Sequence, residues 1–329
     1  MWFTAGVLSA RVPDLPGMQL LVAVREHGSL GAAGAALGMS QQAASWRVRA
    51  LERQVGTALV ARGPRGSRLT EHGRLVARWA DEVLEAAARM DAGVTALQAD
   101  LAGHLDVAAS LTVAEHLLPG WLIGLRDGRA LRGLPPVAVR LRPMNSDAVA
   151  DEVRAGRVPL GFVESPEAPP GLRSRTVRDD ALVLAVPPGH PWARRGTVPA
   201  AVVAATPLVC REEGSGTRRT LLRALTPHLP AGEALAPPAL EVPSAAAVRT
   251  AVVSGIAPGA LSGLAVADDL ALGRLVAVTV LDADGGPVAV ERPLRAVWRS
   301  GRTPPDGAAR DLLAVAAGRV RTPSAGSPG

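Results

Sequence analysis

The apolar positions between residues 40 and 56 follow the period of an α-helix. They recur at intervals of four, three and four residues, and they are Ala44, Val48, Leu51 and Val55. Ser40 precedes the segment as an N-cap, and Gly56 ends it. The opposite face is polar, and its residues are Gln41, Gln42, Ser45, Arg49 and Arg53. The pattern predicts an amphipathic helix whose polar face is available to a partner.

A second, shorter helix is predicted upstream, over the small residues SLGAAGAALG at 29–38. Ser29 is its N-cap, and its alanines allow a neighbouring helix to approach closely. Gly38 and Met39 form the turn into the next helix. Two helices joined by so tight a turn form a helix-turn-helix, whose second helix lies in the DNA major groove. Gln and Arg read base edges there, and Ser and Arg also hold phosphates.

The chain after Gly56 predicts a basic wing. Three arginines surround a turn rich in Gly and Pro between two short extended pieces, and they are Arg62, Arg65 and Arg68. Their charge suits the phosphate backbone or an adjacent minor groove.

Residues 75–102 predict a linker helix with a heptad seam. Its apolar positions alternate between spacings of four and three residues, and they are Val83, Ala87, Met90, Val94, Leu97 and Leu101. A single helix with such a stripe has nothing of its own to cover it, so we interpret the seam as a dimerisation surface. The alternative is that the stripe packs on the body of the same chain.

From His104 the pattern changes to alternating strands and helices. Residues 104–164 have the order βαβαβ, with one helix over 111–125, and a second set of strands and helices follows. The fold class is therefore α/β and multidomain, and we expect a mostly parallel sheet with helices on both faces. Two similar lobes imply a cleft between them. Residues 321–329 are expected to be a disordered tail.

The composition agrees with a folded protein of several domains, because 329 residues with 48% hydrophobic side chains can supply sizeable cores. Apolar runs end well short of the ~20 residues that a membrane span requires, and no secretory signal is evident, so we expect a cytoplasmic protein. Cys210 is the sole cysteine, and the six histidines are scattered without metal-ligand spacing. We expect no metal and no cofactor.

The positive charge is concentrated near the N-terminus. All 36 cationic side chains are arginine, and the net charge is +6. Residues 15–78 hold nine arginines, three glutamates and no aspartate, so they carry the whole excess and the remaining chain is neutral. A basic domain on a neutral body indicates a protein that meets a polyanion with one end only.

Residues 18–73 resemble the winged helix-turn-helix of LysR-type transcriptional regulators. The matching residues are Glu26, Gly28, Ser29, Ala32, Ala33, Leu37, Ser40, Gln41, Ser45, Val48, Leu51, Glu52, Leu59, Val60, Arg62, Leu69, Thr70 and Gly73. So many matches at fixed spacing form a strong signal. Gln42 stands where the family often has proline, and Trp46 where it often has Arg or His. These departures bear on the operator sequence and not on DNA binding itself.

The resemblance covers about residues 15–318 and implies three parts. They are a DNA-binding domain at 15–74, a dimerisation linker helix at 75–102, and an effector-binding domain at 103–320 similar to periplasmic solute-binding proteins. We place lobe I at about 103–177 and 267–320 and lobe II at about 178–266, with chain crossings near residues 177 and 267. The expected partners are double-stranded promoter or operator DNA, a small-molecule effector, further copies in a dimer or tetramer, and RNA polymerase. The residues expected to bind DNA are Ser29, Ser40, Gln41, Gln42, Ser45, Trp46, Arg49, Arg53, Arg62, Arg65 and Arg68.

Two stretches fit an effector site at strand ends, where helix N-termini favour anions. One is the first strand-to-helix junction of the body, and the other is GSGTR at 214–218 in the other lobe. By resemblance, the residues that grip or line the cleft are Ser110, Thr112, Asn145, Ser146, Glu164, Arg211, Ser215, Gly216, Thr217 and Arg218. An anionic effector, a carboxylate or small oxyanion, is the preferred class. The alternative for each Ser or Thr is a plain helix N-cap.

No set of residues indicates an enzyme. The GxSxG motif is absent, GSGTR lacks the lysine of a phosphate-binding loop, and Cys210 is expected to be a buried structural thiol. Of the six tryptophans, only Trp46 is placed to touch DNA or the first helix, and the others are expected to be packing residues. The sequence therefore predicts a ligand-responsive transcription regulator. The alternative is a solute-binding or enzymatic two-lobed body tethered by its N-terminal domain.

Overall fold

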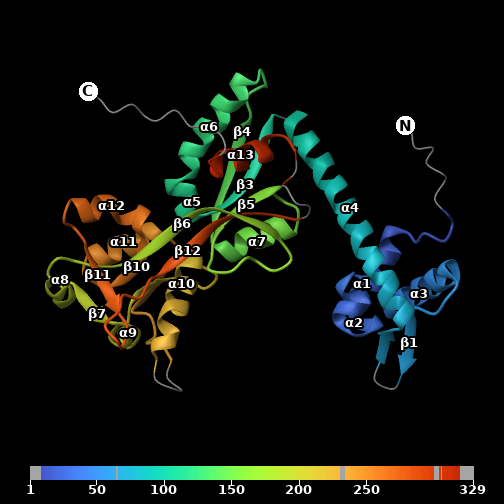
Figure 1. Ribbon diagram of the computed structural model, residues 1–329, viewed down its shortest axis with the longest axis horizontal. Helices are drawn as coiled ribbons and strands as arrows, with labels where there is room; N and C mark the ends of the chain where they lie inside the picture. The colour runs from blue at the N-terminus through green and yellow to red at the C-terminus, as the bar shows by residue number, and fades with distance from the viewer. Residues whose placement is uncertain are drawn as a thin grey trace. The chain divides into compact units, whose positions relative to one another are not determined.

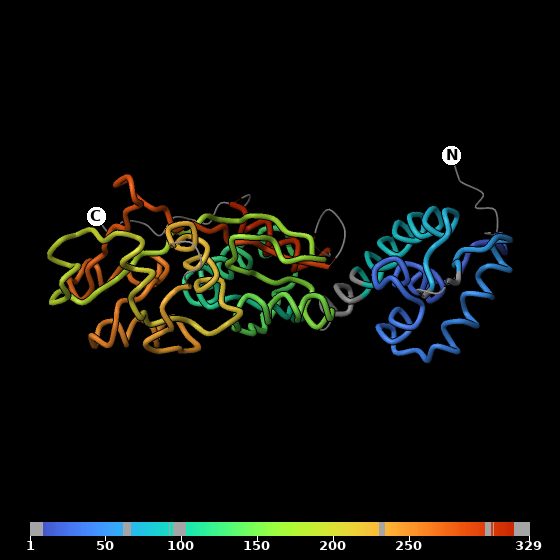
Figure 2. Tube along the Cα trace, turned by 90° about the horizontal axis from the view of Figure 1, so that it is seen from below, coloured from blue at the N-terminus to red at the C-terminus, as the bar shows by residue number. Residues whose placement is uncertain are grey.

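The computed structural model describes residues 9–63, 66–101, 103–229, 234–299, 304 and 306–318. Contacts divide the chain into two compact units, residues 1–91 and residues 92–329 (Figure 2). The first unit has one hydrophobic core among its described residues, and the second has several. None of the helices in the described ranges has both the length and the apolar character that a bilayer crossing needs. The predicted tail at 321–329 lies outside the described residues.

The first unit is a winged helix-turn-helix. Its elements are α1 (Leu15–His27), α2 (Leu30–Ala36), α3 (Gln41–Val55), β1 (Val60–Gly63), β2 (Gly66–Leu69) and the start of α4 (Glu71–Leu101) (Figure 1). The three short helices enclose a core that includes Leu20, Leu21, Val24, Leu30, Ala33, Ala44, Val48 and Leu51. The apolar face predicted for α3 is therefore its buried face, and the predicted helix-turn-helix is confirmed.

The caps and turns of this unit use the predicted residues. Ser29 and Ser40 each accept a hydrogen bond on Oγ from the backbone N–H three residues ahead, at 3.1 and 3.2 Å. Gly38 and Gly56 have φ of +68° and +84°, a region that favours glycine. The turn geometry between α2 and α3 and the end of α3 follow from these positions.

Glu52 fixes the wing to α3. Its Oε1 accepts hydrogen bonds from the backbone N–H groups of Leu59 and Val60 at 2.8 and 3.0 Å. Val60 begins the antiparallel hairpin of β1 and β2, where it pairs with Leu69. One carboxylate thus links α3 to the wing.

The second unit has two lobes that share one mixed sheet (Figure 1). Lobe I contains the parallel strands β4 (Ala138–Met144), β3 (His104–Ser110) and β5 (Leu160–Glu164), followed by the antiparallel β12 (Glu291–Trp298) and β6 (Arg173–Val186). Its helices are α5 (Leu111–His116), α6 (Leu118–Leu131), α7 (Ser146–Arg154) and α13 (Ala308–Ala316). Helices α5, α6 and α13 share one apolar core with the strands, and α7 belongs to a separate core on the other face.

Lobe II is built around the second half of β6. Its strands are β7 (Thr197–Pro199), β8 (Val209–Arg211), β9 (Leu240–Val242), β10 (Gly259–Ser262) and β11 (Val276–Leu281). Its helices are α8 (Pro191–Arg195), α9 (Ala200–Ala204), α10 (Gly216–Leu225), the 3-10 turn η1 (Thr226–His228), α11 (Ala245–Val253) and α12 (Gly263–Ala271). Both β10 and β11 pair antiparallel with β6. Two apolar cores flank the sheet.

Three expectations about the second unit are wrong in detail. The single helix expected over 111–125 is two helices, because Pro119 starts a new first turn in α6. The sheet is mixed, because β6 and β12 run antiparallel to their neighbours. The second crossing is not near residue 267. Helix α12 and strand β11 stay in lobe II, where β11 pairs with β6, so the chain returns to lobe I over 282–290.

The first crossing, expected near residue 177, lies inside β6. Residues 173–181 of β6 pair with β12 of lobe I, and residues 182–186 pair with β10 and β11 of lobe II. The strand continues unbroken between the lobes. Local periodicity cannot reveal this, because it reports a strand but not its partners.

Candidate functional site

The polar face of α3 is an exposed surface. A shallow hollow on this face is lined by Gln41, Gln42, Ser45, Trp46 and Arg49. Trp46 is 66% exposed, although large apolar side chains are usually mostly covered. The residue types that read base edges and phosphates therefore lie together on one helix face.

Two arginines of this face, Arg49 and Arg53, are exposed, and no acidic side chain within the described part of the chain pairs with them. Arg47 on the same helix differs, because Asp14 lies 3.0 Å from its Nη1. Exposed arginines without a counter-charge are suited to phosphate.

The wing is described only in part. Arg68 on β2 is exposed. The side chain of Arg62 and the whole of Arg65 lie outside what the structure describes. Ser29 and Ser40 act as N-caps, so their expected DNA contacts remain predictions.

Helix α4 carries an uncovered apolar stripe. Its exposed members are Val83, Met90 and Val94, at 41%, 73% and 44%. Ala87 is half-buried, and the side chains of Leu97 and Leu101 lie outside the described ones. Trp79, one turn before the stripe, is 56% exposed, so its assignment as a packing residue is wrong for this chain alone. The stripe is thus one turn longer than the heptad pattern indicates.

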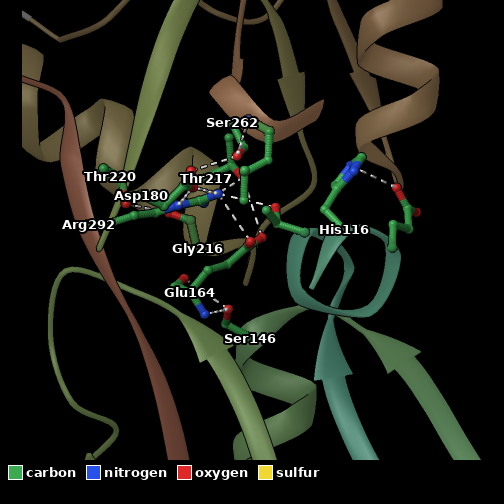
Figure 3. A network of polar contacts seen from close by, with 12 residues as sticks. His116, Ser146, Glu164, Asp180, Gly216, Thr217, Thr220, Ser262 and Arg292 are labelled. Carbon is green, nitrogen blue, oxygen red and sulfur yellow. Dashed lines mark hydrogen bonds and ion pairs between the residues drawn. The ribbon is translucent and has the colours of Figure 1, made fainter. Parts of the chain in front are cut away.

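A buried polar cluster lies where the two lobes meet, and Arg292 of β12 is at its centre (Figure 3). Its Nε and Nη2 donate to Asp180 Oδ2 at 2.9 and 2.8 Å. Its Nη2 also donates to Thr112 Oγ1 of lobe I at 3.2 Å, and its Nη1 donates to Thr217 Oγ1 of lobe II at 2.9 Å. Ser262 Oγ donates to Asp180 Oδ1 at 2.7 Å. One arginine therefore ties side chains of both lobes together.

Glu164, at the end of β5, is the second buried carboxylate of the cluster. Its Oε2 lies 3.1 Å from Arg292 Nη2 but outside hydrogen-bond alignment. Its Oε1 accepts a long hydrogen bond of 3.5 Å from Thr217 Oγ1. A Cβ at Gly216 would lie 1.3 Å from the Glu164 carbonyl oxygen, so lobe II meets lobe I here through bare backbone. Ser146 Oγ donates to the same carbonyl oxygen at 3.0 Å.

Several buried polar atoms at the facing ends of the lobes have no hydrogen-bond partner in the described chain. They are Ser110 Oγ, Ser215 Oγ, Arg211 Nη1 and Glu164 Oε2. Ser110 and Ser215 precede α5 and α10 without accepting a capping bond, so the plain N-cap alternative is wrong for both. Asn145, for which no such alternative was given, does cap α7 and accepts from the Ala148 N–H at 3.0 Å. Buried groups left unpartnered are uncommon and require an explanation.

Arg211 is held by its neighbour in sequence. Glu212 accepts from Arg211 Nε and Nη2, both at 2.8 Å. Burial acts to raise the pKa of Glu212, but the Arg211 guanidinium, a backbone hydrogen bond and Asn145 together lower that pKa. The pair is therefore neutral overall, and Arg211 Nη1 remains available at the lobe contact.

Arg218 does not join the cluster, so its expected place in the cleft is wrong. It follows Thr217 by one residue, which turns it by about 100° around the helix. It pairs with Glu241 and lines an apolar hollow of about 280 Å³ inside lobe II together with Cys210. Burial raises the pKa of the Cys210 thiol, which keeps it in the unreactive protonated form.

The sequence reasoning missed Arg292, Asp180 and Ser262. They lie on β12, β6 and β10, strands whose pairing no local pattern encodes. Two of them had a signal in the sequence, which was a charged residue directly before a mostly apolar strand segment. Arg292 precedes PLRAVW, and Asp180 precedes ALVLAV. Within the described residues, no group of three or more His, Cys, Asp or Glu side chains could hold a metal ion.

Comparison with known proteins gives matches to both units. Residues 15–74 match the family model for the bacterial regulatory helix-turn-helix protein, lysR family, and residues 98–321 match the LysR substrate binding domain. An uncharacterised HTH-type transcriptional regulator of Mycobacterium tuberculosis is 47% identical over 307 residues, which cover 93% of this chain and 97% of that protein. The regulator YeiE of Escherichia coli is 31% identical over 282 residues, covering 86% and 89%.

Solved structures share the fold. Full-length OxyR from Pseudomonas aeruginosa is similar with a TM-score of 0.52 at 22% identity, covering 94% of this chain and all of that one. The Synechocystis CcmR regulatory domain, solved in complex with 2-PG, has a TM-score of 0.55 at 20% identity and covers 67% of this chain and 98% of that one.

Proposed function

This chain belongs to the LysR family of transcriptional regulators, and from that membership we propose how its residues act. It is a regulator and not an enzyme, so the alternative of a tethered enzymatic or solute-binding body is set aside. We propose that it binds promoter DNA through α3 and the wing, dimerises through α4, and answers to a small effector between its lobes. We also propose that it acts in the cytoplasm, because it acts on promoter DNA.

In the proposed DNA complex, α3 lies in the major groove. Gln41, Gln42, Ser45, Trp46 and Arg49 face base edges, because they share one exposed helix face. The remaining predicted contacts go to phosphates, and they come from Ser29, Ser40, Arg53, Arg62, Arg65 and Arg68. The exposed arginines without a counter-charge support this division.

The proposed dimer covers the stripe of α4. Trp79, Val83, Met90 and Val94 are each at least 41% exposed in one chain. Apolar side chains repeated on one helix face are covered when a second helix packs against them. Two DNA-binding units then act together on an operator with two half-sites. We further propose that two dimers pair into a tetramer and that the bound regulator contacts RNA polymerase.

The proposed effector site is the polar cluster between the lobes. The main support is that buried polar groups from both lobes lack hydrogen-bond partners there. They are the Ser110 and Ser215 hydroxyls and Arg211 Nη1. All three can donate to an anionic group, and Ser215 precedes the N-terminus of a ten-residue helix. We therefore propose that the effector carries an anionic group. The effector changes the closure of the lobes to the extent that its affinity differs between the two states.

The test combines DNA binding with ligand screening. Purified protein is footprinted on its own upstream intergenic DNA across a salt series, and the titration is repeated with small carboxylates and oxyanions. A protected site with interrupted dyad symmetry, a steep loss of affinity with salt and an effector-dependent change in protection are expected. Weak binding that ignores sequence contradicts the proposed DNA contacts. Protection that no small molecule alters contradicts the proposed effector site.

A further inference from the structure

The buried cluster between the lobes has an unequal charge. Arg292 supplies one positive charge, and Asp180 and Glu164 supply two negative charges, with side chains at most 3% exposed. The nearby Arg211 and Glu212 form their own neutral pair. With both carboxylates ionised, one negative charge has no cation to balance it in a place that water hardly reaches, and this would be costly.

The two carboxylates do not share the guanidinium equally. Asp180 receives two hydrogen bonds from Arg292 and one from Ser262, at 2.7 to 2.9 Å. Glu164 receives the 3.5 Å bond from Thr217, and its Oε2 lacks an aligned donor. The uncompensated charge therefore resides on Glu164. This carboxylate needs a positively charged donor, and the described chain offers it none with good geometry.

Hydrogen-bond donors that lack an acceptor lie at the same lobe contact. The hydroxyls of Ser110 and Ser215 and Arg211 Nη1 are buried donors without an acceptor. Ser110 ends β3, which pairs directly with β5, the strand that ends at Glu164. Ser215 adjoins Gly216, which touches the Glu164 backbone. Donors in need of an anion thus flank a carboxylate in need of a cation.

We infer that the effector is a small zwitterion of the α-amino acid type. Its ammonium group binds Glu164, and its carboxylate binds the hydroxyls of Ser110 and Ser215. This inference rests on the proposed effector site and specifies its ligand. An anion alone would add a second uncompensated negative charge beside Glu164. A cation alone would leave the hydroxyl donors without an acceptor.

Gly216 of lobe II lies directly against the Glu164 backbone of lobe I while the lobes touch. A Cβ at position 216 already overlaps the Glu164 carbonyl oxygen. The amino acid therefore enters when the lobes rotate apart about β6. Its ammonium group then donates hydrogen bonds to the Glu164 carboxylate, whose Oε2 receives no aligned hydrogen bond from Arg292.

The experiment is thermal unfolding of the full chain with matched ligands. Each of the twenty amino acids is compared with its deaminated acid and its decarboxylated amine, for example alanine with propionate and ethylamine. We expect at least one amino acid to raise Tm in a saturable manner, while its two counterparts have no effect. Isothermal titration then gives the affinity of that amino acid.

Two variants separate the ammonium contact from general effects. Glu164→Gln removes the uncompensated charge, so we expect a higher Tm without ligand and about ten- to a hundred-fold weaker binding of the amino acid. Glu167→Gln removes a carboxylate that is 77% exposed nearby, and binding should not change. A merely structural role of Glu164 would not produce opposite signs in these two readouts.

The outcomes also separate this inference from the proposed function. Stabilisation by deaminated acids that is equal to that by amino acids, and stronger in Glu164→Gln, keeps the effector site but overturns the ammonium contact. Glu164 would then be a built-in competitor for the effector anion. Absence of any response to the twenty amino acids overturns the zwitterion assignment. Footprinting with inorganic oxyanions then tests whether the proposed effector site binds an anion at all.

Discussion

Replacement of Arg292 by methionine is the most direct perturbation of the lobe contact. Methionine keeps most of the apolar length of the side chain but removes the guanidinium that bonds Asp180, Thr112 and Thr217. Asp180 and Glu164 would then remain at 3% and 2% side-chain exposure without a cation. The variant converts a cluster with one excess negative charge into a cluster with two.

The cost follows from the burial of these groups. Removal of one partner from a buried ion pair destabilises proteins by about 3–5 kcal/mol. In a unit of roughly this size, each kcal/mol shifts Tm by about 2–4 °C. We therefore expect Arg292→Met to lower the Tm of the effector-binding unit by about 6–20 °C. The DNA-binding unit should not change, because it has its own hydrophobic core.

The assay is differential scanning calorimetry of the full chain with two companion variants. Arg178→Met removes an exposed arginine from β6, the strand that pairs with β12, and should change stability by no more than about 0.5 kcal/mol. Glu164→Gln combined with Arg292→Met removes one of the two stranded carboxylates, so it should recover part of the loss. The non-additivity of the pair measures their coupling.

A small effect of Arg292→Met would refute this reasoning. If its Tm falls by no more than that of Arg178→Met, the guanidinium does not hold the two carboxylates. Full additivity of the double variant would show that Glu164 and Arg292 act independently. Either result would also remove the charge argument for a zwitterionic effector.

Four further predictions address the remaining surfaces. Arg49→Ala should weaken operator binding by about 1–3 kcal/mol without changing thermal unfolding, and unchanged affinity would contradict the placement of Arg49 in the groove. Thr112→Val should keep DNA binding but lose the effector response, and a variant that responds at the same concentration rules Thr112 out. Met90→Glu should convert the dimer into a monomer in light scattering, because it puts a charge into the seam of α4; an unchanged mass would reject the seam. Hydrogen bonds from Arg249 and then Arg274 lower the pKa of Asp269 below its ordinary 3.8. The stabilisation is therefore complete above that ordinary value and is lost as the pH falls through the lowered one. The Tm advantage of the wild type over Asp269→Asn should shrink in acid, and an advantage independent of pH would contradict this.

The sequence predicts the first unit well because its signals are local. Caps, glycine turns and the apolar face of α3 all lie within a few residues of the structure that they specify. Local rules also single out Ser110 and Ser215, since both stand where a strand enters a helix. Glu164 was named through the family resemblance, and no local pattern singled it out.

The rest of the site depends on pairing between distant strands. Asp180 and Arg292 are separated by 112 positions in sequence and meet because β6 and β12 are neighbours in the sheet. A periodic pattern contains no information about that neighbour. Arg218 shows the complementary error, because a single residue of helical rotation turns it from the lobe contact to Glu241 and the interior hollow of lobe II.

The unbroken course of β6 limits how the lobes can move. A bend between residues 181 and 182 would break ladder hydrogen bonds to β12, β10 and β11 on both sides of the crossing. A change of twist would preserve those bonds, because sheet strands are already twisted and tolerate a range of angles. We therefore expect the lobes to rotate about the long axis of β6, with the change of twist distributed over the fourteen residues of the strand. When the effector dissociates, β6 would return to its ligand-free twist, and the lobes would return with it to their ligand-free orientation.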